Sequence, residues 1–330
     1  MVMQSEGDTV VLPFPAPLDM AGSLGFLSRN GDDYLDRWDG ERWLRTLAAG
    51  SRSVPFSCRL LGTRDEPRLE VRVTDPCDLE LVREAAGRSF LLPGRGFGAL
   101  LRRDPVLARL NGRFPGIRQV RQFDLFYGLL RTISAQQVNL RWAATVRRRL
   151  AEAYGERLRV GDDFVYVLRP EVVAGLRVEE LRALQFTTHK AESVLAVAEA
   201  IAGGRLSQDG LAEMDDEGAV RALVAVRGIG PWSADWILVR CLGRARLVAG
   251  DLGVRKAVAI AYLEKETASE AEVRQAVAHW GVHATAAQAI LLHAYAVKAL
   301  ANGRRKLHSQ PDTDGFLSEM GPAGGGETSH

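Results

Sequence analysis

The chain has 330 residues, of which 46% are hydrophobic and 25% charged, and its formal net charge at pH 7 is only +2. Such a chain is long enough for a globular protein of about two domains, and its charge alone gives no indication of nucleic acid binding. The three cysteines Cys58, Cys77 and Cys241 lie far apart, which excludes a zinc-ligand spacing, a cysteine-bound iron–sulfur cluster and a disulfide framework. A reducing compartment is expected.

No targeting or membrane segment is expected from the sequence. Its first residues, MVMQSEGDTVVLPFPAP, lack both a basic stretch and a long apolar stretch, and no uninterrupted apolar run reaches the ~20 residues of a membrane span. These features predict a cytoplasmic protein that has no membrane partner.

The first third of the sequence predicts a small α+β unit. Asp39-Gly40 suits a tight hairpin turn that needs positive φ, and Asp19 is a candidate helix N-cap. Strands are predicted for residues 9–14, 38–47, 53–61 and 68–73, and helices for 19–29 and 78–86.

The pattern then changes to helices, and no further strand is predicted. Helical spacing of apolar residues predicts helices at 123–135, 139–154, 178–184, 190–202, 217–226, 231–242, 252–263, 270–280 and 286–301. Asp216 and the capping box that begins at Ser269 are candidate helix starts. We therefore expect an α+β domain over residues 1–115 and helical domains over 116–303. The polar, Gly-rich residues 304–330 are expected to form a flexible tail.

One short stretch, VRGIGPWSAD from Val226, predicts a tight hairpin between two helices. Arg227 and Gly228 end the first helix, Ile229 lies at the bend, and Pro231 suits the first position of the second helix. Gly228 and Gly230 permit left-handed torsions and the close approach of another backbone. The free N–H groups of the second helix would favour an anion such as a phosphodiester. A plain helix–helix corner explains the glycines equally well.

A second motif, AGDLGVRKA from Ala249, places Asp251 at the start of the next predicted helix. Asp251 is a candidate N-cap there, beside the hairpin. An aspartate at this position is most often no more than a cap. Its combination with the glycine hairpin favours a functional role for Asp251 over a cap alone.

Together the two motifs resemble the helix-hairpin-helix (HhH-GPD) superfamily of DNA glycosylases, and within it the bacterial 3-methyladenine DNA glycosylase II enzymes. The resemblance extends from about residue 15 to residue 302. It also includes FDLFYGLLRTISAQQVNLRWAATV from Phe123 and FTTHKAESVLAVAEAI from Phe186. It implies a TATA-binding-protein-like α+β domain, followed by two helical subdomains with a cleft between them.

The resemblance also implies roles for individual residues. Asp251 would be the catalytic acid that stabilises an oxocarbenium-like sugar and activates water. Aromatic side chains would hold the extruded base, which cation–π attraction favours when the base is methylated and positively charged. The implied base pocket is Trp232, Trp236 and Tyr295; the implied wedge that replaces the base is Gln137 with Gln136; and the implied DNA-binding hairpin is Arg227, Gly228, Ile229 and Gly230.

The implied activity is that of a monofunctional DNA glycosylase that flips out alkylated purines and hydrolyses their glycosidic bond. Trp232 stands where lyase members of the superfamily carry a nucleophilic lysine, and Lys256 is expected to contact phosphate or solvent. The expected partner is double-stranded DNA with damaged bases, bound by a monomer in the bacterial nucleoid. No metal or organic cofactor is expected, although the hairpin carbonyls could hold a monovalent cation.

The sequence leaves open two alternative functions and the role of two arginine clusters. A non-catalytic DNA-binding protein would need only the hairpin, and a bifunctional glycosylase/lyase for oxidised bases would need an amine near the sugar. Arginines gather in two places, and they could follow the DNA backbone or simply be solvated. These are Arg102, Arg103, Arg109, Arg113, Arg118 and Arg121, and then Arg147, Arg148 and Arg149.

Overall fold

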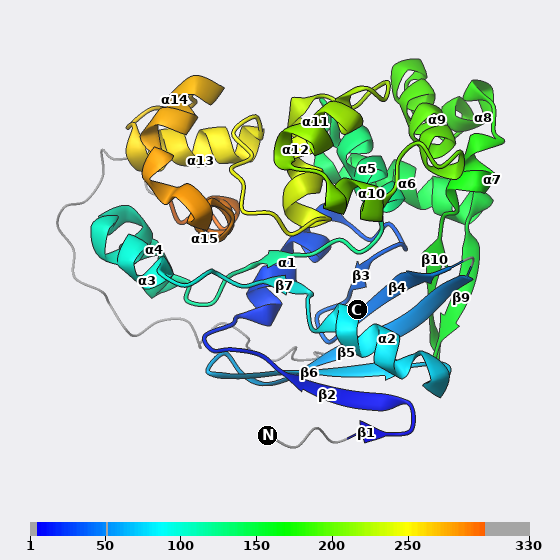
Figure 1. Ribbon diagram of the computed structural model, residues 1–330, viewed down its shortest axis with the longest axis horizontal. Helices are drawn as coiled ribbons and strands as arrows, with labels where there is room; N and C mark the ends of the chain where they lie inside the picture. Colours follow the sequence, from blue (N-terminus) through cyan, green and yellow to red (C-terminus); the bar gives the residue numbers. More distant parts are fainter. Residues whose placement is uncertain (1–4, 51, 301–330) are drawn as a thin grey trace, which may run out of the picture.

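The computed structural model describes residues 5–50 and 52–300. Figure 1 shows an antiparallel sheet on one side of the molecule and two groups of helices beside it. An N-terminal α+β part followed by helices is therefore confirmed for the described residues, whereas the likeness of the sheet part to TATA-binding protein stays a prediction. The predicted flexible tail, residues 304–330, lies outside the described residues.

Six antiparallel strands form the N-terminal sheet, in the order β1-β2-β6-β5-β4-β3. Alternation places one set of side chains, such as Leu12, Phe56 and Val71, in a core that α1 and α2 complete. The predicted turn at Asp39-Gly40 joins β3 to β4, and Gly40 has φ 108°. The elements are β1 (Ser5–Glu6), β2 (Thr9–Pro13), α1 (Met20–Asn30), β3 (Arg37–Trp38), β4 (Arg42–Ala49), β5 (Arg52–Thr63), β6 (Glu66–Val73), the 3₁₀ turn η1 (Pro76–Asp78) and α2 (Leu79–Ala86).

The remaining elements are mostly helices. They are β7 (Phe90–Leu91), α3 (Phe97–Arg103), α4 (Pro105–Arg113), β8 (Gln119–Val120), α5 (Leu125–Ala135), α6 (Leu140–Tyr154), β9 (Glu156–Val160), β10 (Asp163–Val167), α7 (Pro170–Ala174), α8 (Val178–Ala183), α9 (Thr188–Ala202), α10 (Gln208–Glu213), α11 (Asp216–Val224), α12 (Pro231–Arg240), α13 (Leu252–Tyr262), α14 (Glu270–Ala276), the 3₁₀ turn η2 (Ala278–His283) and α15 (Ala284–Ala296).

The prediction that no strand follows the α+β part is wrong. Strands β9 and β10 form an antiparallel hairpin, which turns at Gly161 with φ 62°. Val160 and Val165 of this hairpin pack on Leu44 of the sheet. Each strand is only five residues long, which is why the helical periodicity of the flanking segments concealed the hairpin.

Local capping rules placed most helix starts correctly. Asp19 accepts a hydrogen bond from the backbone of Gly22, and Ser269 forms a capping box with Glu272, so both predictions are confirmed. The predicted cap at Asp216 is wrong by one residue. Asp215 is the N-cap and accepts from Gly218 N, so Asp216 lies in the first turn, where its charge still favours the helix dipole.

Hydrophobic packing divides the helices into two groups. One core is built from α5–α12, and the other from α13–α15. Helices α3 and α4, which the sequence analysis did not predict and whose residues fall within the predicted domain 1–115, pack with the second group (Figure 1). Asp104 fixes this contact, because its buried Oδ2 accepts hydrogen bonds from Tyr262 Oη at 2.8 Å and Trp280 Nε1 at 3.1 Å.

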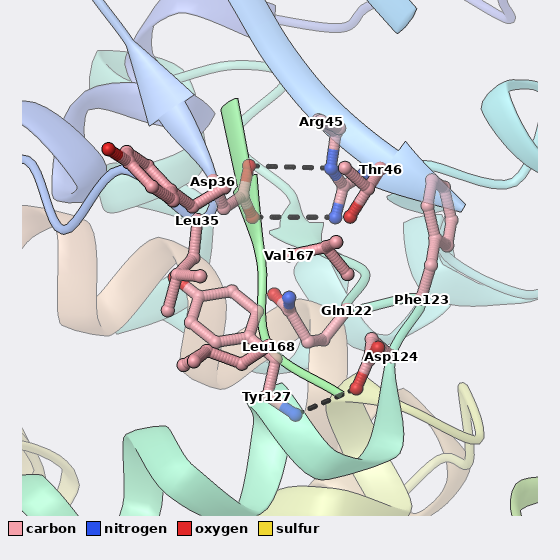
Figure 2. Close-up of a pocket in the computed structure, with 11 residues that line it drawn as sticks. Leu35, Asp36, Arg45, Thr46, Gln122, Phe123, Asp124, Tyr127, Val167 and Leu168 are labelled. Atoms are coloured by element: carbon pink, nitrogen blue, oxygen red, sulfur yellow. Dashed lines mark hydrogen bonds and ion pairs between the residues drawn. The ribbon is translucent and has the colours of Figure 1, made fainter. Parts of the chain in front are cut away.

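A buried ion pair lies where the sheet meets the first helical group. Asp36 pairs with Arg45 at 3.3 Å, and Trp43 Nε1 donates to the same carboxylate at 2.6 Å. Asp36 and Arg45 line a cavity of about 20 Å³ together with Asp124 and Tyr127 of the helical part (Figure 2). A cavity of this size has room for one water molecule. Arg45 Nη1 has no hydrogen-bond partner within residues 5–50 and 52–300.

Candidate active site

A cleft of about 980 Å³ lies between the two helical groups. Its walls come from α1, from the α5–α6 connection and α12 on one side, and from α13 and α15 on the other. Six of the predicted site residues line this cleft, and so does Lys256. The six are Gln136, Gln137, Trp232, Trp236, Asp251 and Tyr295. The volume is large enough for a nucleobase.

The hairpin has the predicted helix–turn–helix form, but its two glycines differ. Gly228 has φ 87°, and a Cβ there would lie 2.1 Å from Ser193 Oγ on α9. Gly230 has φ −96° and is the N-cap of α12, with Pro231 in the first turn as predicted. The left-handed torsion is therefore needed only at Gly228, where it allows close packing against α9.

The first turn of α12 is available to a ligand. Its cap, Gly230, has no side chain to cover the N–H groups, and a Cβ at Gly230 would meet nothing within 4 Å. Ile229 is buried in the core, whereas Arg227 is exposed and pairs with Glu192 at 2.5 Å. The four hairpin residues lie outside the cleft lining. Backbone groups, rather than these side chains, form the open face of the hairpin.

Asp251 is the N-cap of α13, as predicted. Its Oδ1 accepts a hydrogen bond from Val254 N at 3.0 Å, and its Oδ2 accepts one from Trp232 Nε1 at 3.1 Å. The helix and the indole together fix the carboxylate at the cleft. A cap alone would not need the second contact, so the tryptophan indicates a further role for this carboxylate.

Three side chains of α12 form one stripe along the cleft. Trp232, Trp236 and Arg240 are spaced four residues apart, and all three line the cleft. Arg240 Cζ lies 5.2 Å from the ring centroid of Trp236 and 4.9 Å from that of Phe26. Tyr295, which is partly exposed, comes from the opposite wall on α15.

The sequence analysis missed Arg240, Phe26 and Arg131. Arg131 Cζ lies 5.5 Å from the ring centroid of Phe26, on α1, and its Nη1 donates to Tyr127 Oη at 2.9 Å. The spacing of Arg240 after the two tryptophans was visible in the sequence. The contact between Phe26 on α1 and Arg240 on α12 brings together residues 214 positions apart, so no local sequence pattern predicts it.

The predicted wedge lies at the cleft mouth. Gln137 is exposed and has φ 54°, a left-handed conformation between α5 and α6. Gln136 Nε2 donates to Gly228 O at 3.2 Å. Gln136 therefore connects the wedge segment to the hairpin, while Gln137 is free to project.

Two histidines of the last helices differ in position. His293 lines the cleft, and burial lowers its pKa, so it is uncharged at neutral pH. His283 packs instead against Phe97, with ring centroids 5.8 Å apart. Lys256, one turn after Asp251, lines the cleft and is only partly exposed.

Several arginines considered for a DNA track are structural. Arg118 is buried and donates to the backbone carbonyl of Ile117, and Arg121 donates to that of Cys241. Arg147 is buried in an ion pair with Asp33, at 2.7 Å. These three are unavailable to a phosphate on the surface, whereas Arg102, Arg103, Arg109 and Arg113 are exposed on α3 and α4.

Within residues 5–50 and 52–300, no cluster of three His, Cys, Asp or Glu side chains has the arrangement of a metal site. The hairpin carbonyls of Val226 and Gly228 already accept hydrogen bonds from Ile229 N and Gln136 Nε2. A monovalent cation there would have to share these oxygens. None of the helices described is long and apolar enough to cross a membrane.

Comparisons with known proteins agree with this architecture. Residues 130–281 match the model of the HhH-GPD superfamily of base excision DNA repair proteins. The chain is 31% identical over 233 residues to DNA-3-methyladenine glycosylase 2 of Escherichia coli, which covers 69% of this chain and 79% of that protein. It is 26% identical over 248 residues to DNA-3-methyladenine glycosylase of Bacillus subtilis, with 73% and 82% covered.

Solved structures show the same fold at lower sequence identity. The 3-methyladenine DNA glycosylase of Archaeoglobus fulgidus superposes with a TM-score of 0.74 at 22% identity, over 88% of this chain and 98% of that one. The 8-oxoguanine glycosylase/lyase of Clostridium acetobutylicum, in complex with DNA, gives 0.69 at 16% identity, over 91% and 98%. Sequence, fold and site agree that this chain belongs to the HhH-GPD superfamily of base excision DNA repair proteins.

Proposed function

We propose that the chain is a monofunctional DNA glycosylase that hydrolyses the bond between deoxyribose and an alkylated purine. The observation that carries the proposal is the contact of Trp232 with Asp251 inside the cleft. It couples an aromatic face for a base to a carboxylate for the sugar. Relatives named DNA-3-methyladenine glycosylases support the alkylated base as substrate.

In this proposal, Asp251 acts on the sugar. As the glycosidic bond lengthens, positive charge develops at the anomeric carbon and ring oxygen, and an ionised carboxylate nearby stabilises it. Asp251 Oδ1 is held by the N-terminus of α13 and Oδ2 by Trp232. A water molecule that adds to the sugar carbon would lose its proton to the same carboxylate. The base leaves, and the strand stays intact.

The remaining residues would bind and open the DNA. The first turn of α12, whose N-cap Gly230 has no side chain, would favour a phosphate through its N–H groups and the helix dipole. Gln137 would fill the space that the flipped nucleotide leaves in the stack. Trp232, Trp236 and Tyr295 would enclose the base. One chain supplies all these groups, so the proposal is a monomer acting on duplex DNA at the nucleoid, with no metal taking part.

Substitution Asp251→Asn tests the role of the carboxylate. Asparagine keeps an oxygen for Val254 N and is a good N-cap, so the fold should hold. Removal of the negative charge should lower single-turnover release of 3-methyladenine at least about 100-fold, with binding to abasic-site DNA nearly unchanged. Asp251→Glu serves as a charge-preserving comparison. Near-normal release by Asp251→Asn would show that another group catalyses the reaction.

A second candidate function, a combined glycosylase and lyase, is favoured by one observation only. Lys256 lines the cleft that holds Asp251. A lyase would use its amine to form a Schiff base with the sugar, whereas hydrolysis leaves an uncleaved strand.

Borohydride trapping separates the two functions. We expect no covalent adduct between protein and DNA, and strand breaks only after hot alkali. A strong adduct that disappears in Lys256→Ala would replace the hydrolytic proposal by the lyase. An adduct that survives in Lys256→Ala would point to a different amine.

A further inference from the structure

The end of α5, just before Gln137, is held by two basic side chains from other helices. Ser134 is buried, and its backbone oxygen accepts a hydrogen bond from Lys190 Nζ on α9 at 2.9 Å. Its Oγ accepts one from Arg147 Nη1 on α6 at 2.8 Å. Hydrogen bonds from charged donors are stronger than those between neutral groups. The last turn of α5 is therefore fixed before the chain reaches the predicted wedge.

Lys190 occupies a position that its own helix disfavours. It lies in the first turn of α9, where the side chain of Thr187 accepts a hydrogen bond from its backbone N–H. A positive charge is unfavourable near a helix N-terminus and favourable near a C-terminus, and Lys190 Nζ reaches the C-terminus of α5. Within residues 5–50 and 52–300, Lys190 has no carboxylate partner, and its partial burial lowers the pKa of the ammonium. The favourable contact of this lysine is therefore with α5 and not with α9.

The same helix supports the hairpin. Ser193, about one turn after Lys190, packs so closely on Gly228 that a Cβ there would lie 2.1 Å from Ser193 Oγ. Gln136 Nε2 donates to the backbone oxygen of Gly228 at 3.2 Å. Helix α9 thus contacts both the wedge segment and the hairpin, and Gln136 connects these two directly. The backbone that precedes Gln137 is thereby fixed relative to the start of α12.

Gln137 itself is exposed and left-handed. Its φ is 54°, and its side chain makes no hydrogen bond within the part of the chain that the structure describes. A left-handed conformation of a residue other than glycine persists only where the surrounding structure fixes it. The contacts at Ser134 and Gln136 supply this constraint. A side chain without a partner, carried by a fixed backbone, is suited to entering a base stack.

We propose that Lys190 and Gln136 are positioning residues for base extrusion. They hold the wedge segment against the hairpin, so that Gln137 enters the duplex at a set distance from the phosphate bound at α12. The proposal rests on the proposed function, in which Gln137 replaces the extruded nucleotide. A poorly held wedge should matter most where a base pair must be broken, and least where the damaged base is already unpaired.

Base release from paired and unpaired lesions provides the first test. Single-turnover release of 7-methylguanine is measured from a duplex in which it faces cytosine and from one in which it faces an abasic-site analogue. Lys190→Met keeps the length of the side chain but removes its charge. We expect it to release the paired base about tenfold more slowly, from the loss of one charged hydrogen bond, and the unpaired base with a much smaller loss. Gln136→Met should change the ratio of the two rates in the same direction, and Lys190→Arg should restore most of it.

Arg205→Met is the matched control, because Arg205 is an exposed cation beyond the other end of α9. It should leave the ratio of the two rates unchanged. Lys190→Met combined with Gln136→Met should lose less than the product of the two single losses, because both residues hold one segment. Equal losses from both duplexes in Lys190→Met would overturn the proposal, since a phosphate contact or a weakened fold affects both alike. Unchanged release from both duplexes would also overturn it.

Fluorescence provides a second test that needs no base release. A duplex carries 3-deaza-3-methyladenine, whose glycosidic bond resists cleavage, beside 2-aminopurine, which brightens when its neighbour leaves the stack. Brightening should be slower or smaller in Lys190→Met and Gln136→Met than in the wild type and Arg205→Met. If the wild type brightens the 2-aminopurine but releases no 7-methylguanine, the proposed function fails, and the fluorescence still decides the positioning role. Equal traces from all of these proteins would contradict that role.

Discussion

At the scale of single residues, one hydrogen bond separates the two tryptophans of α12. Trp232 and Trp236 present similar rings to the cleft, but only Trp232 donates to Asp251, at 3.1 Å. A donor to a carboxylate stabilises and orients its ionised form. Substitutions at Trp232 and Trp236 can therefore distinguish stacking on the base from orientation of Asp251.

Trp232→Phe should slow base release more than Trp236→Phe does. Both changes keep an aromatic face, but the first removes the N–H that fixes Asp251. We expect about a tenfold lower single-turnover rate for Trp232→Phe, from the loss of one hydrogen bond to a charged group. The two variants should bind lesion DNA about equally. If Trp236→Phe were the slower enzyme, the indole N–H would have no special part in orienting the acid.

The hairpin shows, at the scale of an element, why two similar glycines should behave differently. Gly228 is left-handed, and a Cβ there would lie 2.1 Å from Ser193 Oγ and 2.2 Å from Ser193 Cβ. Gly230 has an ordinary φ of −96° and open space where a Cβ would lie. Gly228 is therefore required for packing against α9, whereas Gly230 borders open space at the start of α12.

Gly228→Ala should therefore destabilise the protein by about 2–3 kcal/mol, while Gly230→Ala should leave its unfolding free energy almost unchanged. If DNA phosphate approaches the start of α12, Gly230→Ala should still weaken binding to damaged and undamaged duplexes alike. Urea unfolding and duplex titration measure the two effects separately. A change in Gly230→Ala limited to one lesion would place this residue in base recognition rather than in phosphate binding.

The elements also show which parts of the structure were predictable. Asp251 and Ser269 follow local capping rules, so their helices could be located from neighbouring residues alone. The β9–β10 hairpin was missed because its strands are short and depend on packing against β4. Arg240 over Phe26 depends on contact between distant elements, so the charge of the cleft could not be predicted from composition.

At the scale of the whole molecule, a buried ion pair holds the first helical group to the segment that enters the sheet. Asp33 precedes β3, and Arg147 lies on α6; both side chains are only 4% exposed. Burial alone would raise the pKa of Asp33, but Arg147 and Arg131 outweigh it and hold this pKa below its ordinary value. Asp33 consequently stabilises the fold above the pKa of an unfolded aspartate, about 3.9, and this contribution is lost as the pH falls.

Arg147→Met should lower the unfolding free energy at pH 7 by about 3–5 kcal/mol, because it leaves Asp33 charged and buried without its main partner. Arg141→Met, at an exposed position on the same helix, is the matched control and should cost less than about 0.5 kcal/mol. In Arg147→Met, burial should raise the pKa of Asp33. Protonation of Asp33 then removes the buried charge as the pH falls. The difference in unfolding free energy between Arg147→Met and wild type should therefore narrow from pH 7 toward pH 4. Adding Asp33→Asn to Arg147→Met should restore much of the lost stability. A difference that stays constant with pH, with no recovery in the double variant, would mean that Arg147 acts through packing and not through its charge.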